Sequence, residues 1–246
     1  MQAVSAQESE RSASERREAL KEVFAQAKKC TRCSELAATR KTVVFGAGNA
    51  DADLMFIGEA PGASEDEQGV PFVGRAGKLL EKLLEEIGLA RTEVFICNVL
   101  KCRPPGNRDP QPIEIENCHE YLHRQVELIE PTVICSLGNF STKLLRGDPT
   151  GITRLHGQPE VLTLGRRAVR LYPIFHPAAA RYTPRMLETL REDFTRLPEL
   201  LALGAPEQPQ ALEMPEVAVE APEAVPEVAQ AEVEGQVSEI DQLGLF

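Results

Sequence analysis

The sequence predicts an α/β fold of three layers (αβα), in which a central, mainly parallel sheet is covered by helices on both faces. Short continuous apolar runs alternate with longer segments of helical periodicity, which is typical of strands and helices that follow one another along a chain. Each apolar run ends at a glycine or a polar residue, as expected for strands buried on both faces. The 246 residues suffice for one compact domain with tails.

The first expected helix covers residues 14–29, because four apolar residues share one helical face: Leu20, Val23, Phe24 and Ala27. The first expected strand covers residues 54–57 and ends at Gly58. Residues 79–87 carry leucines at helical spacing, and Gly88 follows as a plausible C-cap.

The rest of the domain repeats this alternation of strands and helices. Further strands are expected at residues 94–97, 133–137 and 169–175. Further helices are expected at residues 113–129, from Gly138 onward, and at residues 185–203. The segment from Pro104 to Pro112 holds too many prolines for regular structure.

Both ends of the chain differ in composition from this domain. Residues 1–13 are polar and are expected to be disordered. Residues 205–246 are rich in Ala, Pro and Glu and hold ten acidic residues but no Lys or Arg. We expect this tail to be disordered and residues 14–204 to form the folded domain. No apolar run approaches the roughly 20 residues of a membrane span, and no secretion signal begins the chain, so we expect a cytoplasmic protein without a membrane partner.

The net charge of −11 is concentrated in the acidic tail. Without its ten acidic residues, 28 acidic and 27 basic residues remain. Residues 140–191 hold nine basic and three acidic residues, which fits a local basic face that contacts nucleic-acid phosphates. The alternative is that these arginines are scattered and solvated, and charge alone does not decide between the two.

Three polar clusters follow expected strands. Gly58–Gly62, Asn98 and His176 each come directly after an apolar run. Because ligands bind beyond the carboxyl ends of parallel strands, the clusters are expected to meet in one crevice. Taken alone, Asn98 could cap a turn and His176 could close a strand end.

Four of the six cysteines form a ligand pattern. Cys30 and Cys33 form a CxxC pair, while Cys102 and Cys118 flank fifteen residues that include the Pro-rich segment. Four thiolates suit either zinc or an iron–sulfur cluster, and spacing alone favours zinc. Cys97 and Cys135 lie in expected strands and are interpreted as small buried apolar side chains.

In combination, residues 28–200 resemble the iron–sulfur (type 4) uracil-DNA glycosylases. The resemblance rests on Gly58-Glu59-Ala60-Pro61-Gly62, Asn98, His176-Pro177-Ala178 and the cysteine pattern. It implies a base-excision-repair hydrolase that flips uracil out of single- or double-stranded DNA, releases it and leaves an abasic site. It also implies one 4Fe–4S cluster per chain on Cys30, Cys33, Cys102 and Cys118, a monomer, and a location at the nucleoid.

The resemblance assigns roles within a uracil pocket. Gly58, Glu59 and Ala60 line the pocket with their backbone, and Phe72 stacks on the flipped base. Asn98 pairs with the uracil edge, and His176 faces O2 and stabilises the leaving base. On composition alone, Phe72 would be an ordinary core residue.

The catalytic water and the DNA contacts are further expectations. Ala60 occupies the position where better-known uracil glycosylases carry a water-orienting Asp, so Glu59 and Glu65 become the candidates for positioning water. Residues expected near DNA phosphates are Lys101, Arg103 and Arg108. Arg181 is expected to act as a wedge or as a phosphate contact, or it is an ordinary arginine at a helix start.

The chain ends in Gln242-Leu243-Gly244-Leu245-Phe246, which resembles the short peptide that binds the bacterial sliding clamp. Leu243, Leu245 and Phe246 could fill an apolar pocket while Gln242 binds at its rim. A chance terminus, or a tail that docks on its own domain, is the alternative.

Two other functions remain open. A zinc-dependent nucleic-acid-binding module would explain the cysteines and the basic stretch, but not the polar clusters that follow three strands. A relative within the same superfamily, such as a type 5 enzyme, would act on other damaged bases.

Overall fold

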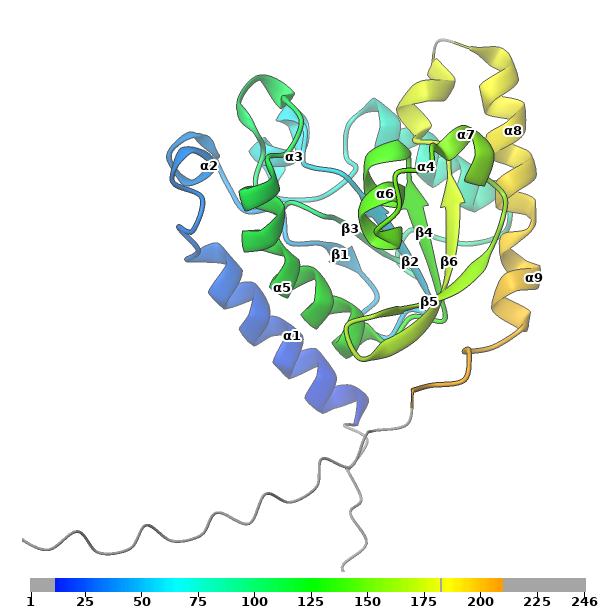
Figure 1. The fold of residues 1–246 in the computed structure, drawn as a ribbon, viewed down its shortest axis with the longest axis horizontal. Coiled ribbons are helices and arrows are strands. Elements are labelled where there is room, and N and C mark those ends of the chain that lie inside the picture. The colour runs from blue at the N-terminus through cyan, green and yellow to red at the C-terminus, as the bar shows by residue number, and fades with distance from the viewer. Residues whose placement is uncertain (1–11, 182, 210–246) are drawn as a thin grey trace, which may run out of the picture. The chain divides into compact units, whose positions relative to one another are not determined.

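A six-stranded sheet forms the centre of the protein (Figure 1). The computed structural model describes residues 12–181 and 183–209. The strand order is β1-β3-β2-β4-β6-β5, and the strands are β1 (Ala47–Gly48), β2 (Leu54–Gly58), β3 (Phe95–Asn98), β4 (Val133–Leu137), β5 (Glu160–Leu164) and β6 (Arg167–Ile174). The four central strands are parallel, and β1 and β5 pair antiparallel at the two edges. The mainly parallel α/β sheet is therefore confirmed.

Helices cover both faces of the sheet, as Figure 1 shows. They are α1 (Ala13–Lys28), α2 (Ser34–Thr39), α3 (Ala63–Gln68), α4 (Arg75–Glu86), α5 (Pro112–Ile129), α6 (Asn139–Arg146), α7 (Ile152–Leu155), α8 (Pro184–Thr195) and α9 (Leu197–Ala202), with the 3-10 turns η1 (Pro105–Asn107) and η2 (Pro177–Arg181). One apolar core joins the sheet to α1 and α5, and a second joins it to α4, α8 and α9. The two cores define three layers.

Strands β2, β3 and β4 are buried along their whole length because both of their faces are covered. Every residue of β2, β3 and β4 is buried, and successive side chains point alternately into the two cores. Met55 and Ile57 belong to the core with α1 and α5, whereas Leu54 and Phe56 belong to the other core. The continuous apolar runs of the sequence therefore identify these strands correctly.

The long helices begin where capping residues allow them to begin. Ser12 and Glu15 form a capping box at the start of α1, and Gln111 and Glu114 form one at the start of α5. At the start of α5, Pro112 occupies a position where its missing N–H leaves no helical hydrogen bond unmade. The expected helices at 14–29 and 113–129 are confirmed within one residue at each end.

The structure corrects three expectations about the elements. The terminal helix at 185–203 is two helices, α8 and α9, because Pro198 stands in the first turn of α9 and cannot continue a helix from α8. The edge strand β5 was not expected, since its residues alternate between half-buried and exposed as far as the buried Leu164 instead of forming an apolar run. Phe24 is 39% exposed and rests against Phe45, with 5.2 Å between ring centroids.

Among the described residues, no helix is long and apolar enough to cross a membrane. The expectations for residues 1–11 and 210–246, including the last five residues, lie outside the described part. Residues 205–209 of the expected acidic tail are described, and the side chain of Gln208 hydrogen-bonds to the backbone of Ala168.

Candidate active site

The carboxyl ends of three parallel strands bring the predicted polar clusters together. Gly58 and Asn98 are paired residues at the ends of β2 and β3, and His176 follows the end of β6. All the clusters line one pocket of about 510 Å³. Its lining residues are Glu59, Ala60, Pro61, Gly62, Glu65, Phe72, Gly74, Arg75, Ala76, Asn98, Pro104, Asn107, Arg108, His176 and Ala178. The predicted convergence is therefore observed.

Gly58 allows two pocket side chains to approach the backbone closely. A Cβ at this position would lie 2.4 Å from Oδ1 of Asn98 and 2.8 Å from Cζ of Phe72. Asn98 itself is only 2% exposed. The absence of a side chain at Gly58 therefore seats both the amide and the ring against the strand end.

Phe72 is held in a conformation that few side chains adopt. Its backbone φ is +52°, in the left-handed region where a non-glycine residue is uncommon. The guanidinium of Arg91 donates to the Phe72 carbonyl at 3.1 Å and also to that of Pro71. Gly77 makes room for the Phe72 carbonyl, since a Cβ there would lie 1.7 Å from that oxygen. No motif in the sequence indicated the support from Arg91 or Gly77.

His176 faces the ring of Phe72, with 5.6 Å between the ring centroids. The backbone N–H of Ala178 donates to Nδ1 of His176 at 3.1 Å. Nδ1 must therefore be unprotonated, and the neutral ring carries its hydrogen on Nε2. Burial lowers the pKa of His176 to about 4, although nearby Glu65 opposes the shift. At neutral pH this side chain is an uncharged hydrogen-bond donor.

The two glutamates of the pocket differ in their contacts. The carboxylate of Glu65 accepts hydrogen bonds from the backbone N–H groups of Val73 at 3.1 Å and Gly74 at 2.9 Å. Its role is to hold the loop that follows Phe72. The carboxylate of Glu59 accepts no hydrogen bond among the described residues. Burial, followed by the charge of Asp109, raises the pKa of Glu59.

The prediction that Lys101 contacts DNA is wrong, because its side chain is buried. Lys101 is 1% exposed, and its ammonium donates to the backbone carbonyl of Asn98 at 2.7 Å and to Oε1 of Gln125 at 2.5 Å. The amide of Gln125 in turn donates to the carbonyl of Phe45 at 2.9 Å. This chain of bonds anchors the end of β3 from beneath. The sequence interpretation missed it because Gln125 lies far along the chain.

The other expected DNA contacts lie in or near the Pro-rich segment. Arg108 lines the pocket, and its guanidinium is paired with Glu114 at 2.6 Å and with Glu35 at 2.7 Å. The guanidinium of Arg103 donates to Asn107 at 2.7 Å. The side chains of Arg181, Gln242, Leu243, Leu245 and Phe246 lie outside the described residues.

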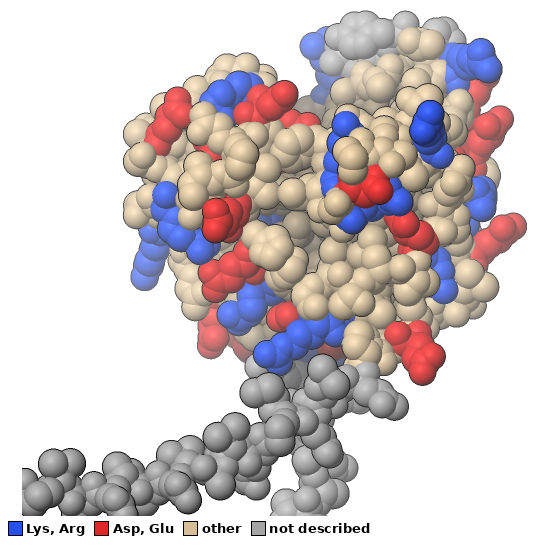
Figure 2. All heavy atoms as spheres, viewed as in Figure 1, with Lys and Arg blue, Asp and Glu red and all other residues tan. Residues whose placement is uncertain are grey.

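The basic stretch at 140–191 does not form a surface of one sign in the view of Figure 2, where Lys and Arg alternate with Asp and Glu. Several of its arginines are paired: Arg146 with Glu160, Arg167 with Glu130 and Arg191 with Glu86. These pairs reduce the positive charge that is free to meet phosphate.

The four patterned cysteines come from three parts of the fold. Cys30 and Cys33 lie between α1 and α2, Cys102 follows β3, and Cys118 lies in α5. Cys102 and Cys118 are buried in the core that includes α1 and α5, and the other two pack against that core. Burial raises the pKa of Cys118 to about 11. Among the described residues, no group of three or more potential ligands is arranged to hold a metal ion.

Positive and polar groups surround the cysteine sulfurs. Arg40 donates to Sγ of Cys102 at 3.0 Å, and Asn117 donates to Sγ of Cys33 at 3.4 Å. Burial opposes ionisation of Cys30, but hydrogen bonds from Tyr121 and Arg32 lower its pKa overall. These contacts favour the thiolate form, although burial outweighs the Arg40 contact and raises the pKa of Cys102. Cys97 and Cys135, by contrast, are fully buried within strands, as expected for small apolar side chains.

Comparison with known proteins finds similarity to uracil-DNA glycosylases. A family model described as the uracil DNA glycosylase superfamily matches residues 45–198. The chain is 42% identical over 193 residues to a type-4 uracil-DNA glycosylase of Archaeoglobus fulgidus, covering 77% of this chain and 96% of that relative. It is 46% identical over 180 residues to a type-4 uracil-DNA glycosylase of Saccharolobus solfataricus, covering 71% and 83%. Identity to a type-5 uracil-DNA glycosylase of Pyrobaculum aerophilum is 28% over 199 residues, covering 68% and 87%.

Proposed function

The chain belongs to the type-4 uracil-DNA glycosylases, which are DNA-repair hydrolases of N-glycosyl bonds, and we propose how its pocket carries out that reaction. The enzyme flips a deoxyuridine out of single- or double-stranded DNA into the pocket and hydrolyses the bond between N1 and C1′. Free uracil leaves, and an abasic site remains. The observation that carries this proposal is that Phe72, Asn98 and His176 line one pocket beyond the strand ends.

Asn98 is proposed to select uracil by its hydrogen-bonding edge. Uracil presents an O4 acceptor next to an N3–H donor, and one carboxamide can donate to the first and accept from the second. Cytosine reverses both groups, so an amide of fixed orientation rejects it. The side chain of Asn98 approaches Gly58 closely, and Lys101 donates to the backbone carbonyl of Asn98. Both contacts support a fixed position of this residue.

Phe72 and His176 are proposed to hold and release the base. The ring of Phe72 stacks on the flipped uracil. As the N1–C1′ bond breaks, its electron pair stays on uracil, and negative charge develops on N1 and O2. The Nε2–H of neutral His176 donates a hydrogen bond to O2 and stabilises that anion without transferring a proton.

The attacking water is proposed to be placed by Glu59. Ala60 offers no carboxylate, and the carboxylate of Glu65 is occupied by two backbone N–H groups. Glu59 lines the pocket and has no hydrogen-bond donor among the described residues. The sugar then develops oxocarbenium character before water adds to C1′, and the water proton passes to Glu59 or to solvent.

A cleavage assay tests the function. Oligonucleotides with U·G, U·A, single-stranded U, T·G or hypoxanthine are incubated with the enzyme and treated with alkali to reveal abasic sites. Uracil-specific release is the expected result. Release of several damaged bases would favour a broader specificity within the superfamily, and release of none would favour a binding module without catalysis.

The four patterned cysteines are proposed to carry one 4Fe–4S cluster. Their fit rests on the donor set of four cysteines and on the Arg40, Arg32 and Asn117 groups that favour thiolates. Four cysteine sulfurs also suit a single zinc ion, and the cluster is preferred because the chain resembles the iron–sulfur (type 4) enzymes. A bound cluster would supply a covalent tie between the N-terminal helices, the Pro-rich segment and α5, and we assign it no redox step.

Iron and sulfide analysis tests the cluster. A brown protein with four irons per chain is expected. Cys30→Ala or Cys118→Ala should destabilise the fold before it affects the rate of uracil release. A colourless protein with one zinc per chain and full activity would overturn the assignment.

The last five residues are proposed to bind the sliding clamp, with the acidic tail as a tether for a monomeric enzyme. A peptide of residues 236–246 should bind the clamp with micromolar affinity in calorimetry. The double variant Leu245→Ala, Phe246→Ala should not bind. Equal binding by both peptides, or by neither, would end this proposal, and removal of residues 210–246 should leave uracil excision intact.

A further inference from the structure

A second pocket adjoins the proposed uracil pocket, and Glu59 and His176 line both of them. It encloses about 610 Å³. Its lining residues are Glu59, Asp109, Ile115, Leu137, Gly138, Asn139, Phe140, Lys143, Leu144, Gly147, Asp148, Pro149 and His176. The volume falls within the ordinary range of small-molecule sites. None of the roles proposed above uses the residues that α6 contributes to it.

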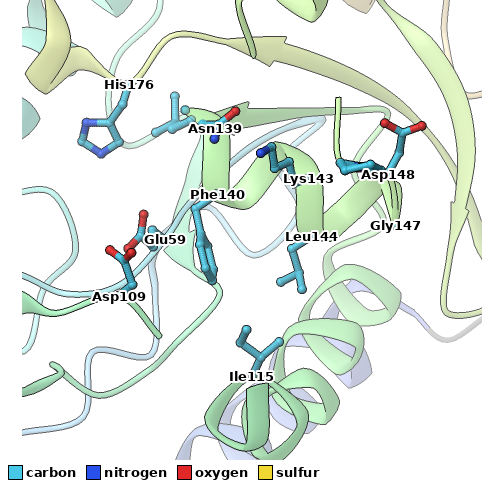
Figure 3. Close-up of a pocket in the computed structure, with 13 residues that line it drawn as sticks. Glu59, Asp109, Ile115, Asn139, Phe140, Lys143, Leu144, Gly147, Asp148 and His176 are labelled. Atoms are coloured by element: carbon cyan, nitrogen blue, oxygen red, sulfur yellow. The ribbon is translucent and has the colours of Figure 1, made fainter. Parts of the chain in front are cut away.

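Three charged groups of this second pocket have no partner of opposite charge among the described residues. They are the carboxylates of Glu59 and Asp109 and the ammonium of Lys143. The two carboxylates are close enough for Asp109 to raise the pKa of Glu59, and Figure 3 shows them side by side. Asp148, in contrast, is occupied by Arg146 at 3.2 Å and by the Thr150 N–H at 2.6 Å. The charges of Asp109 and Lys143, which the proposed reaction does not use, are therefore available to a ligand.

An aromatic ring and aliphatic side chains form the rest of the pocket. Figure 3 shows Phe140 extending from α6 toward Glu59 and Asp109, with Leu144 and Ile115 beyond it and Lys143 on the same helix. Phe140 and Lys143 are both partly exposed. The pocket thus offers a stacking surface, two acceptors at one side and a donor at another.

We propose that this second pocket binds the base of the nucleotide next to the flipped deoxyuridine in single-stranded DNA, and that it prefers an amino-bearing base, guanine above all. The inference rests on the proposed function, because only a strand whose uracil occupies the first pocket presents its neighbour to the second. Because Glu59 and His176 line both pockets, the pockets adjoin, and the base next to the flipped one is the group that the second pocket would receive.

The hydrogen-bonding groups of the bases explain the preference. Guanine carries two adjacent donors, N1–H and the 2-amino group, which match the two oxygens of one carboxylate, such as that of Asp109. Its O6 and N7 acceptors match an ammonium such as that of Lys143. Adenine and cytosine each carry one amino group, and thymine carries a single donor between two acceptors. A phosphate would not be favoured beside Glu59 and Asp109, because both are negatively charged when ionised.

Stacking on Phe140 provides the part of the binding that does not depend on base identity. Stacking of a base on an aromatic side chain contributes enough to change affinity by roughly five- to over a hundredfold. An abasic neighbour should lose this contribution entirely. The expected specificity is therefore a general need for a neighbouring base, with guanine preferred.

The test measures kcat/KM for single-stranded oligonucleotides with one uracil whose 5′ or 3′ neighbour is G, A, C, T or an abasic analogue. On one of the two sides, kcat/KM should decrease from G to A and C and then to T. It should be about tenfold lower again for the abasic neighbour. Asp109→Asn should remove the preference for G over T. Phe140→Leu, which keeps an apolar side chain, should lower kcat/KM by about tenfold for every neighbour that carries a base, with the order of G over T retained.

Lys143→Met should weaken the preference for G, while the matched control Lys82→Met, an exposed lysine of α4, should not. Melting temperatures confirm that each variant is folded. If kcat/KM did not depend on the base at either neighbouring position, the proposal for the second pocket would be wrong, while the proposed function would stand. A preference for G that survives Asp109→Asn, or rates for base-bearing neighbours that are unchanged in Phe140→Leu, would also overturn the proposal for the second pocket. No release from any substrate would overturn the proposed function and this inference together.

Discussion

The uracil pocket and the cysteine region are built from different kinds of contact. Backbone geometry shapes the pocket: Gly58 admits Asn98 and Phe72 at close range, and the Ala178 N–H holds the ring of His176. Charged and polar side chains from separate elements shape the cysteine region, such as Arg40 on Cys102. Backbone contacts therefore fix the shape of the pocket, whereas the cysteine region places positive side chains beside sulfurs that could hold a metal cluster.

This contrast predicts that changes in the pocket reduce catalysis without unfolding the protein, while changes among the cysteines do the reverse. Lys101 is the contact between the two regions, because it is adjacent to Cys102 in the chain and bonds to the carbonyl of Asn98.

Replacement of His176 should give the largest effect on catalysis. His176→Ala removes the donor to uracil O2, and kcat should fall by about 10²–10³-fold, as for other donors that stabilise an anion. Single-turnover kinetics would measure the loss, with iron content and melting temperature unchanged. The control is His119→Ala, an exposed histidine of α5. A parallel loss of iron in His176→Ala would contradict the separation of the two regions.

Replacement of Lys101 should affect both regions. Lys101→Met leaves the carbonyl of Asn98 and Oε1 of Gln125 without their buried donor, so the free energy of unfolding should fall by about 3 kcal/mol. Uracil should be distinguished from cytosine about tenfold less well, because Asn98 loses an anchor. Denaturant melts and paired U and C substrates would measure this, with Lys82→Met as the control. Unchanged discrimination in a destabilised protein would mean that Lys101 serves only the core.

The pH dependence of stability should show the buried His176. Its pKa of about 4 in the folded protein lies below its ordinary value of 6.5, so the unfolded chain takes up the proton first as the pH falls. This contribution to stability is fully present above pH 6.5 and is lost as the pH falls toward 4. Melts of the wild type and of His176→Gln should therefore converge toward acidic pH. A constant difference between the two proteins would show that His176 does not titrate in this way.

Replacement of Ala60 should give the smallest change. Ala60→Asp adds a carboxylate beside Glu59, so uracil release should be retained or rise by a few fold, because a second group can orient water. Ala60→Asn has nearly the same shape without the charge and is the matched control. A complete loss of release by folded Ala60→Asp, but not by Ala60→Asn, would contradict the proposed placement of water.

Local patterns in the chain were enough to predict the central strands and most of the pocket. Strands β2, β3 and β4 are short, mainly apolar runs, as buried parallel strands require, and β6 is apolar apart from Arg167 and Arg170. Since parallel strands end at one edge of the sheet, the order of the motifs implied that Asn98 and His176 meet. The resemblance to a family added roles that periodicity could not supply.

The sequence by itself determined the α/β class, the strands of the parallel core and the residues that follow them, because periodicity and chain order are local properties. The tertiary structure alone decided which charges are buried and which are free. Lys101 reads as a basic residue beside a Pro-rich segment, yet Gln125 and the Asn98 carbonyl enclose it. Lys143 and Asp109 read as ordinary surface charges, yet they line one pocket. Such environments depend on residues far apart in the chain, so a local sequence pattern cannot predict them.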